Sequence, residues 1–369
     1  MAGSTPLKTA MIGLRHGHVG SIGPENPGYI ASFRGLEGVE VVAYCEDVEP
    51  QLLEPARRHH PTAHLYTSVD ELIAHEDFDV ACIVLPAYQV AEVGIKLAEA
   101  GKHFYMEKQF ARTAEDLKPL VRAVRRTGVK VMLGYMYRSN PAIREVKRFI
   151  DGGVFGQPLM VEARHVTSQV LPGAARDPRN FLYTNEEEGG GILHMLACHD
   201  VEVMRFLMGC EVKAVQAMVG RPVGFMDEPL EDLAVAAFEY ENGAYGSLNA
   251  GYLTPPKGGD RDTALVYRGM DGWARFGNLD HDPTLLTVAS TSPQWSGSPE
   301  RHFTYKLKPS PGYGGSQWFN DWIQGYIHAI QRDQEPASSV EDALHVLQCV
   351  DAAYESSRTG RRIEVGYGV

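Results

Sequence analysis

The beginning of the chain alternates short apolar segments with segments of helical spacing. Helix candidates lie at 29–38, 89–102 and 113–127. The apolar segments, which read as strands, lie at 7–13, 39–45, 78–86, 103–107 and 129–135. Strands that alternate with helices at this period predict a parallel sheet with right-handed crossovers. We therefore expect a doubly wound parallel sheet over residues 1–132.

After about residue 133 the pattern changes to one helix, at 141–152, followed by many β-rich segments. The turns ENG and GMDG between these segments favour an antiparallel sheet, and we expect a large open one over residues 133–369. The segment 278–316 is rich in Gly, Ser and Pro and is expected to form long loops. Two helices, at 316–332 and 339–358, are expected to follow it.

Composition limits the class of protein. A chain of 369 residues with 44% hydrophobic residues exceeds one ordinary core, so we expect two domains. A formal net charge of −12 and a pI near 5.6 disfavour nucleic acid and anionic membrane surfaces as partners.

The five cysteines form no CxxC pair and lie mostly in apolar segments, which indicates reduced thiols. The start of the chain shows no secretion signal, and no apolar run approaches 18 residues. These observations predict a cytoplasmic protein.

A glycine-containing turn, GLRHGHVG, follows the first strand. Turns of this kind bring backbone N–H groups and a helix N-terminus against a diphosphate, which makes Gly13, Gly17 and Gly20 candidates for a dinucleotide site. The spacing departs from G-x-G-x-x-G, so a merely structural turn remains the alternative. The side chains between and beside the glycines would either contact phosphate or face solvent; they are Arg15, His16 and His18.

The second strand ends at two acids, Glu46 and Asp47. A carboxylate at this point accepts hydrogen bonds from both ribose hydroxyls and repels a 2′-phosphate, which favours NAD over NADP. Glu46 is the first candidate, and Asp47 is the second because the loop before it is long. An acid that only caps the next turn is the alternative.

Two further segments carry candidate chemistry. GKHFYMEKQF, at 101–110, places Glu107 and Lys108 where a strand stops. GGGILHMLACHDVE, at 189–202, leads from three glycines into a helical segment with His199. An imidazole titrates near neutral pH and suits general acid–base catalysis.

Together these two segments resemble the Gfo/Idh/MocA oxidoreductases, which are nicotinamide-dependent sugar and cyclitol dehydrogenases. The segments 137–165 and 340–365 resemble the passage between that family's domains and its closing helix, so the resemblance covers most of the chain. It implies a Rossmann-like NAD-binding domain at 1–132 and a substrate-binding and oligomerisation domain at 133–369, and it implies a homodimer or homotetramer formed through the second sheet.

The resemblance also implies residue roles. Leu85 and Pro86 stand where the family has the start of Thr-Pro-Asn, and Glu107 and Lys108 match its Glu-Lys-Pro motif, in which the lysine lies beside the nicotinamide and the substrate hydroxyl. His199 would take the hydroxyl proton. The family carboxylate expected four residues before His199, one helical turn away, is replaced by Met195.

Several residues are candidates to replace that carboxylate: His194, Asp200, His165 and Arg138. His194 and His199 lie about 140° apart around a helix, which argues against a zinc site, and a core histidine is the alternative for His194. Tyr135, Arg138 and His165 are candidates to contact a polyol, with domain packing as the alternative for Tyr135 and Arg138.

These residues predict hydride transfer between NAD and a secondary alcohol of a sugar, sugar derivative or cyclitol. Because Met195 removes the customary carboxylate, a redox-assisted lyase or hydrolase that recycles NAD is a second hypothesis. A non-catalytic nucleotide-binding sensor is a third.

Overall fold

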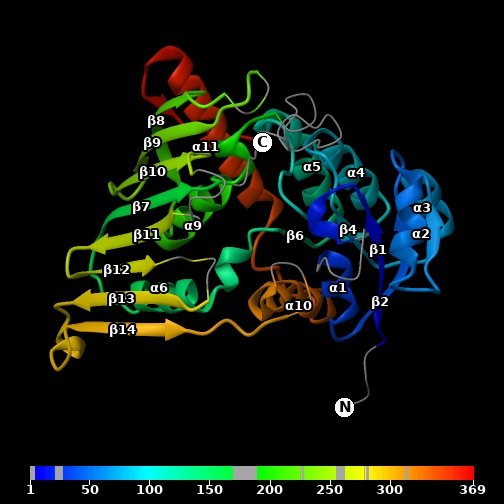
Figure 1. Cartoon of the computed structure of the whole chain (residues 1–369), viewed down its shortest axis with the longest axis horizontal. Coiled ribbons are helices and arrows are strands. Elements are labelled where there is room, and N and C mark those ends of the chain that lie inside the picture. Colours follow the sequence, from blue (N-terminus) through cyan, green and yellow to red (C-terminus); the bar gives the residue numbers. More distant parts are fainter. Residues whose placement is uncertain are drawn as a thin grey trace.

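Two sheets organise the chain in the computed structural model (Figure 1). The structure describes residues 5–20, 28–168, 189–224, 226, 228–254, 262–277, 279, 282–310, 312 and 315–369. None of the helices in these ranges combines the length and the apolar character that a membrane crossing requires.

The first sheet has six parallel strands in the order β3-β2-β1-β4-β5-β6. This order reverses between β1 and β4, which is where doubly wound sheets bind nucleotides. The predicted doubly wound parallel sheet is confirmed. Its strands are β1 (Leu7–Ile12), β2 (Val39–Cys45), β3 (His64–Tyr66), β4 (Val80–Ile83), β5 (His103–Met106) and β6 (Val131–Leu133). Its helices are α1 (Tyr29–Arg34), α2 (Leu53–Arg57), α3 (Val69–His75), α4 (Ala87–Glu99) and α5 (Ala114–Thr127).

Helix α5 shows how local sequence sets these elements. The Thr113 side chain accepts a hydrogen bond from the Asp116 backbone N–H, and Gly128 ends the helix with a φ of 70°. Helix α1 is shorter than expected because it stops before Gly35. The short elements α2, β3 and α3 were missed because they lack a long apolar period.

The second sheet has nine strands in the order β14-β13-β12-β11-β7-β10-β9-β8-β15. Neighbouring strands are antiparallel except for β7 and β10, which are parallel, so the expected mostly antiparallel sheet is confirmed. The strands are β7 (Pro158–Val166), β8 (Val212–Gly220), β9 (Leu233–Tyr240), β10 (Tyr245–Gly251), β11 (Asp262–Gly269), β12 (Gly272–Gly277), β13 (Thr284–Ser290), β14 (Glu300–Tyr305) and β15 (Ile363–Glu364).

The expectation of long loops at 278–316 was wrong. Strands β13 and β14 lie in this segment and extend the sheet beyond β12. Along β13 the even positions from Thr284 to Ser290 are buried while the intervening side chains are more exposed, which is the period of a strand with one covered face. The Pro, Gly and Ser residues between the two strands concealed this alternation.

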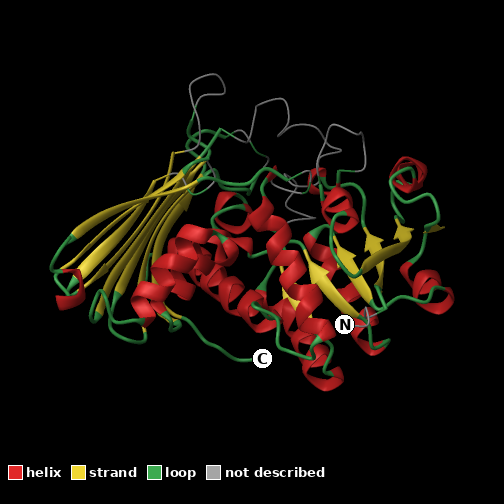
Figure 2. Cartoon of the chain, turned by 90° about the horizontal axis from the view of Figure 1, so that it is seen from below, coloured by secondary structure: helices red, strands yellow, loops and turns green. Residues whose placement is uncertain are grey.

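Helices cover one face of the nine-stranded sheet, as Figure 2 shows. Helix α9 packs on β7, α11 on β8 and α6 on β13. The helices of this part are α6 (Pro141–Asp151), α8 (Ile192–Met195), α9 (Cys198–Met208), α10 (Gln317–Gln331) and α11 (Val340–Thr359). Short 3₁₀ helices lie at η1 (Gly17–Val19), η2 (Pro50–Leu52), η3 (Met136–Ser139) and η5 (Pro293–Trp295).

Candidate functional site

The turn after β1 lies against the end of β4. Gly13 has a φ of 87°, and a Cβ there would lie 2.3 Å from the Val84 carbonyl oxygen and 2.8 Å from Leu85, so only glycine fits. Around Gly17, by contrast, a Cβ would meet no atom of the described residues within 4 Å. The turn is therefore closely packed on the sheet side and has open space at the start of η1. Pro86 follows Leu85 as the N-cap of α4.

The two acids at the end of β2 have different environments. Glu46 is 2% exposed, and its carboxylate accepts hydrogen bonds from the backbone N–H groups of Leu14, Val48 and Glu49 at 2.7–3.0 Å. Asp47 is exposed. Glu46 thus holds the turns after β1 and β2 together, while the Asp47 carboxylate faces solvent.

Lys108 is buried beyond the end of β5. Its side chain extends from the first sheet to α8, where the ammonium donates a hydrogen bond to the Met195 carbonyl oxygen at 3.1 Å. In the part of the chain that the structure describes, this is its only hydrogen bond. A buried ammonium with two N–H groups still available is suited to holding a substrate oxygen.

The last of the three glycines before α8, Gly191, packs against Glu231, whose carboxylate is buried. Glu231 accepts hydrogen bonds from the backbone N–H groups of Gly191 and Leu193 at 2.7 and 2.8 Å, and from the Tyr354 hydroxyl at 3.0 Å. A carboxylate at a helix N-terminus satisfies otherwise unpaired donors. Burial raises the pKa of Glu231, and these hydrogen bonds oppose the rise.

The segment with His199 is not one continuous helix, which corrects the expectation of a single turn between Met195 and His199. Helix α8 ends at Met195, and α9 begins at Cys198. The His199 ring lies partly exposed, 6.0 Å from the Tyr135 ring and 5.4 Å from the Tyr137 ring, between ring centroids. The Lys108 ammonium therefore contacts the last residue of α8, and the imidazole stands in the first turn of α9.

Comparisons with known proteins agree with this arrangement. A family model described as an oxidoreductase family with an NAD-binding Rossmann fold matches residues 7–135, and the Gfo/Idh/MocA C-terminal domain model matches residues 143–275. The chain belongs to the Gfo/Idh/MocA oxidoreductases. The predicted family, the oxidoreductase class and the NAD cofactor are confirmed.

Individual relatives of this Gfo/Idh/MocA protein are more distant. It is 29% identical over 299 residues to the scyllo-inositol 2-dehydrogenase (NAD(+)) of Bacillus subtilis, with 80% of each chain covered. It is 24% identical over 352 residues to the levoglucosan dehydrogenase of Pseudarthrobacter phenanthrenivorans, with 86% of this chain and 88% of the relative covered. A solved levoglucosan dehydrogenase complex with NADH and L-sorbose superposes with a TM-score of 0.82 at 24% identity and covers 98% of this chain and all of that one, which shows the shared fold.

The residues at the topological switch fit the dinucleotide that the family binds. The turn at Gly13 and Gly17 offers a packed inner side and an open outer side, as a diphosphate cradle requires, and Asp47 is exposed at the end of β2. His16 is buried, and burial followed by the charges of His18 and Lys108 lowers its pKa well below the usual value, so it is neutral near pH 7.

Three of the candidates for the missing family carboxylate have defined partners. Asp200 and His165 are both buried and lie 2.9 Å apart, which makes them a pair between α9 and β7. The Nε2 atom of His194 donates to the Ala111 carbonyl oxygen at 3.1 Å. Burial lowers the pKa of His194 to about 4, so it is a poor base at neutral pH.

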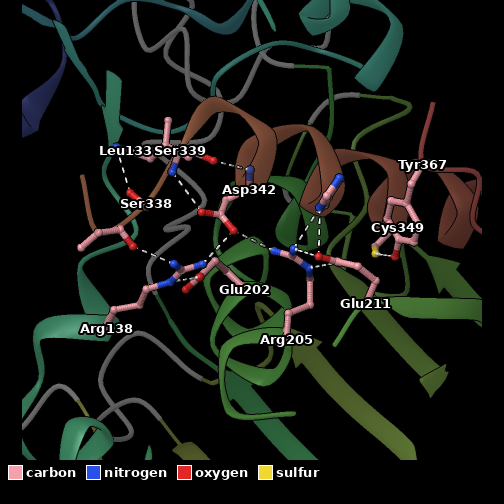
Figure 3. Close-up of polar contacts among 12 residues, drawn as sticks. Leu133, Arg138, Glu202, Arg205, Glu211, Ser338, Ser339, Asp342, Cys349 and Tyr367 are labelled. Carbon is pink, nitrogen blue, oxygen red and sulfur yellow. Dashed lines mark hydrogen bonds and ion pairs between the residues drawn. The ribbon is translucent and has the colours of Figure 1, made fainter. Parts of the chain in front are cut away.

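Arg138 lies in an ion-pair cluster with Glu202 of α9 and Asp342 of α11, as Figure 3 shows. Its guanidinium donates to Glu202, to Asp342 at 3.0 Å and to the Ala337 carbonyl oxygen at 2.8 Å. Tyr135 is 1% exposed and packs edge-on against Phe110. These contacts match the packing alternative for both residues, and their contact with a polyol stays a prediction.

The same cluster continues to Arg205, which pairs with Glu211 of the loop before β8 (Figure 3). Burial alone would raise the pKa of Glu211, yet hydrogen bonds from His345 and Arg205 outweigh it and lower the pKa to about 2. A carboxyl whose folded pKa lies below its unfolded value stabilises the fold above the unfolded pKa, and this contribution is lost as the pH falls.

We expect Glu211→Gln to make the free energy of unfolding depend less steeply on pH at acidic pH. Between about pH 4.5 and pH 2 the wild type should lose on the order of 1–2 kcal/mol more unfolding free energy than the variant, a range that allows for solvent screening of a partly exposed group. Urea unfolding at stepped pH values measures this difference. Glu145→Gln, at an exposed pair with Arg148, is the control and should keep the wild-type slope; equal slopes for all three proteins would contradict the prediction.

Sequence reasoning missed Tyr29, Glu231 and Tyr252. Tyr29 donates to Glu107, and the Tyr252 hydroxyl contacts the Met195 sulfur at 3.3 Å. Each of these contacts joins segments distant in sequence. The only signal available for Glu231 was a pair of acids at the start of an apolar strand, which suggests buried hydrogen bonding.

Proposed function

We propose that this oxidoreductase oxidises a secondary alcohol of a sugar, sugar derivative or cyclitol with NAD. The observation that carries the proposal is the buried Lys108 ammonium, whose one hydrogen bond among the described residues goes to the Met195 carbonyl oxygen and leaves N–H groups for a substrate oxygen. The relatives named as inositol and levoglucosan dehydrogenases support the substrate class.

Bound NAD would supply the hydride acceptor. We assign the diphosphate to the turn that carries Gly13, Arg15, His16, Gly17 and His18. The ribose is assigned to Asp47 in preference to Glu46, because three backbone N–H groups already occupy the Glu46 carboxylate. Leu85, Pro86 and Glu107 are assigned to the border of the nicotinamide pocket.

The chain's own residues divide the remaining chemistry. Lys108 stabilises the negative charge that develops on the substrate oxygen when its proton leaves. His199 accepts that proton, since its partly exposed ring can pass the proton on to solvent. His194 and Asp200 are weaker candidates, because His194 remains neutral and Asp200 is paired with His165.

The direct test is NADH formation with a panel of neutral sugars and cyclitols. We expect NADH absorbance to rise in step with ketone formation for at least one ring-shaped polyol. A panel that yields neither NADH nor a chemically altered polyol would contradict the proposal.

A second candidate follows from Met195, which stands where the family has a carboxylate. A route in which transient oxidation enables elimination or hydrolysis would convert substrate while NADH absorbance returns to its starting value. Product analysis beside the absorbance trace distinguishes the two routes.

We also propose that copies of the chain associate through the open face of the nine-stranded sheet, as a homodimer or homotetramer. Exposed apolar side chains on its strands support this: Met218, Val235, Tyr245 and Leu285. Light scattering that gave the mass of a single chain would contradict it. The five cysteines, all without disulfides, support a reducing cytoplasmic setting, and the domain division at residue 132 remains a prediction.

A further inference from the structure

Three elements meet at the Glu107 carboxylate. This side chain follows β5 and is 3% exposed. Its Oε1 atom lies 3.2 Å from Nδ1 of His18 in η1, and its Oε2 atom accepts a hydrogen bond from the hydroxyl of Tyr29, the first residue of α1. The turn and the helix that border the dinucleotide site therefore both hold the side chain next to Lys108.

The contacts are necessary for a carboxylate in this position. Burial raises the pKa of Glu107, while the charge of Lys108 and the Tyr29 hydrogen bond oppose the rise. A buried carboxylate without such partners is costly, so its placement depends on them. The Tyr29 hydroxyl is itself 3.1 Å from the Tyr105 hydroxyl, which extends the cluster back into β5.

His18 is held at its backbone as well as at its ring. Its N–H donates to Nδ1 of His16 at 2.9 Å, so the two histidines of the turn form one unit. The His18 side chain is 27% exposed, whereas that of Glu107 is 2% exposed. His18 therefore links the solvent-exposed side of the turn to the buried carboxylate of Glu107, the residue next to Lys108.

We propose that His18 is a positioning residue that links cofactor binding to the orientation of Lys108. It acts through Glu107. When a dinucleotide occupies the turn, the His18–Glu107 contact fixes the adjacent Lys108 relative to that dinucleotide. By reciprocity, a Glu107 side chain held in place by His18 strengthens dinucleotide binding. The inference rests on the proposed function for the catalytic role of Lys108, but the His18–Glu107 contact can be tested with NAD alone.

The first experiment is a double-mutant cycle read by calorimetric titration with NAD in the absence of substrate. His18→Ala should weaken NAD binding about tenfold, the effect of one charge-assisted hydrogen bond, and His18→Gln, which keeps a donor, should recover most of it. The double variant His18→Ala with Glu107→Gln should bind no more weakly than Glu107→Gln alone. Additive losses would overturn the proposal.

The second experiment uses a polyol from the panel. We expect His18→Ala to lower kcat about 10- to 100-fold while the KM for the polyol stays within about threefold, because the misplaced group is Lys108 and not a polyol contact. His64→Ala is the matched control: His64 also pairs with a carboxylate, Glu76 at 2.6 Å, but on β3 at the sheet edge, and it should match the wild type. A loss in KM alone, or equal losses in both variants, would overturn the proposal.

Thermal melts verify that each variant folds. If His18→Ala does not fold, Tyr29→Phe, which removes the hydroxyl that donates to Glu107, enters the same cycle with Glu107→Gln, and additive losses there overturn the proposal equally. A panel without any oxidised polyol would reject the proposed function while the NAD cycle still decides the His18 contact.

Discussion

Lys108→Ala should lower kcat for polyol oxidation about 10²- to 10³-fold while NAD binding stays within a few-fold of the wild type. The expected size is that of losing one preorganised donor to a developing oxyanion. The ammonium is buried and donates to the Met195 carbonyl oxygen, so it is held at the junction of the two sheets before any substrate arrives. Stopped-flow measurement of NADH formation with the best polyol of the panel tests this.

Lys102→Ala is the matched control for that experiment. Lys102 also donates to a backbone carbonyl, that of Phe78 at 2.6 Å, and its ammonium lies 4.7 Å from the centre of the Phe78 ring, but it stands at the opposite end of β5. Its loss should change stability without changing kcat by more than about twofold. Unchanged turnover in both variants would contradict the role of Lys108, and NAD binding without turnover in all three proteins is the result that a non-catalytic nucleotide sensor would give.

The fold was predictable where the period of apolar residues in the sequence follows the order of strands and helices in the structure. The apolar alternation up to Leu133 defined a parallel sheet because βα crossovers follow one hand, and Thr113 and Gly128 set the limits of α5 locally. Strands β13 and β14 were not predictable in this way, because β13 buries Thr284 and Ser290 while Leu285 is exposed, and because Pro, Gly and Ser fill the segment between the two strands.

The site was predictable as a set of residues but not as a set of contacts. The position of Lys108 after a strand and of His199 after the glycines identified both residues. Glu46 accepts a hydrogen bond from the Leu14 N–H, 32 residues away, and Arg138 donates to Glu202, 64 residues away. No local period reveals such pairings, so the contacts of these two side chains became known only from the structure.

The triplet before α8 gives the largest expected effect on stability. A Cβ on Gly191 would lie 1.9 Å from the Glu231 carbonyl oxygen and 2.7 Å from the Glu231 backbone nitrogen, and neither atom can rotate away. The same Gly191 N–H donates to the Glu231 carboxylate, so displacing it also leaves a buried acceptor poorly satisfied. We expect Gly191→Ala to lower the free energy of unfolding by about 3 kcal/mol or more.

Gly325→Ala is the control that separates a steric clash of the new Cβ from the general effect of replacing glycine by alanine. Gly325 lies inside α10 and is exposed, and a Cβ there would come within 4 Å of no atom in the described part of the chain. The substitution should therefore raise the unfolding free energy by roughly 0.5–1 kcal/mol, because alanine restricts the unfolded chain and favours helix. Urea unfolding of both variants measures the contrast.

Because α8 ends at Met195, whose carbonyl oxygen holds Lys108, any Gly191→Ala protein that folds should also lose turnover. A Gly191→Ala protein as stable and active as the wild type would show that the α8 N-terminus does not depend on its close approach to Glu231.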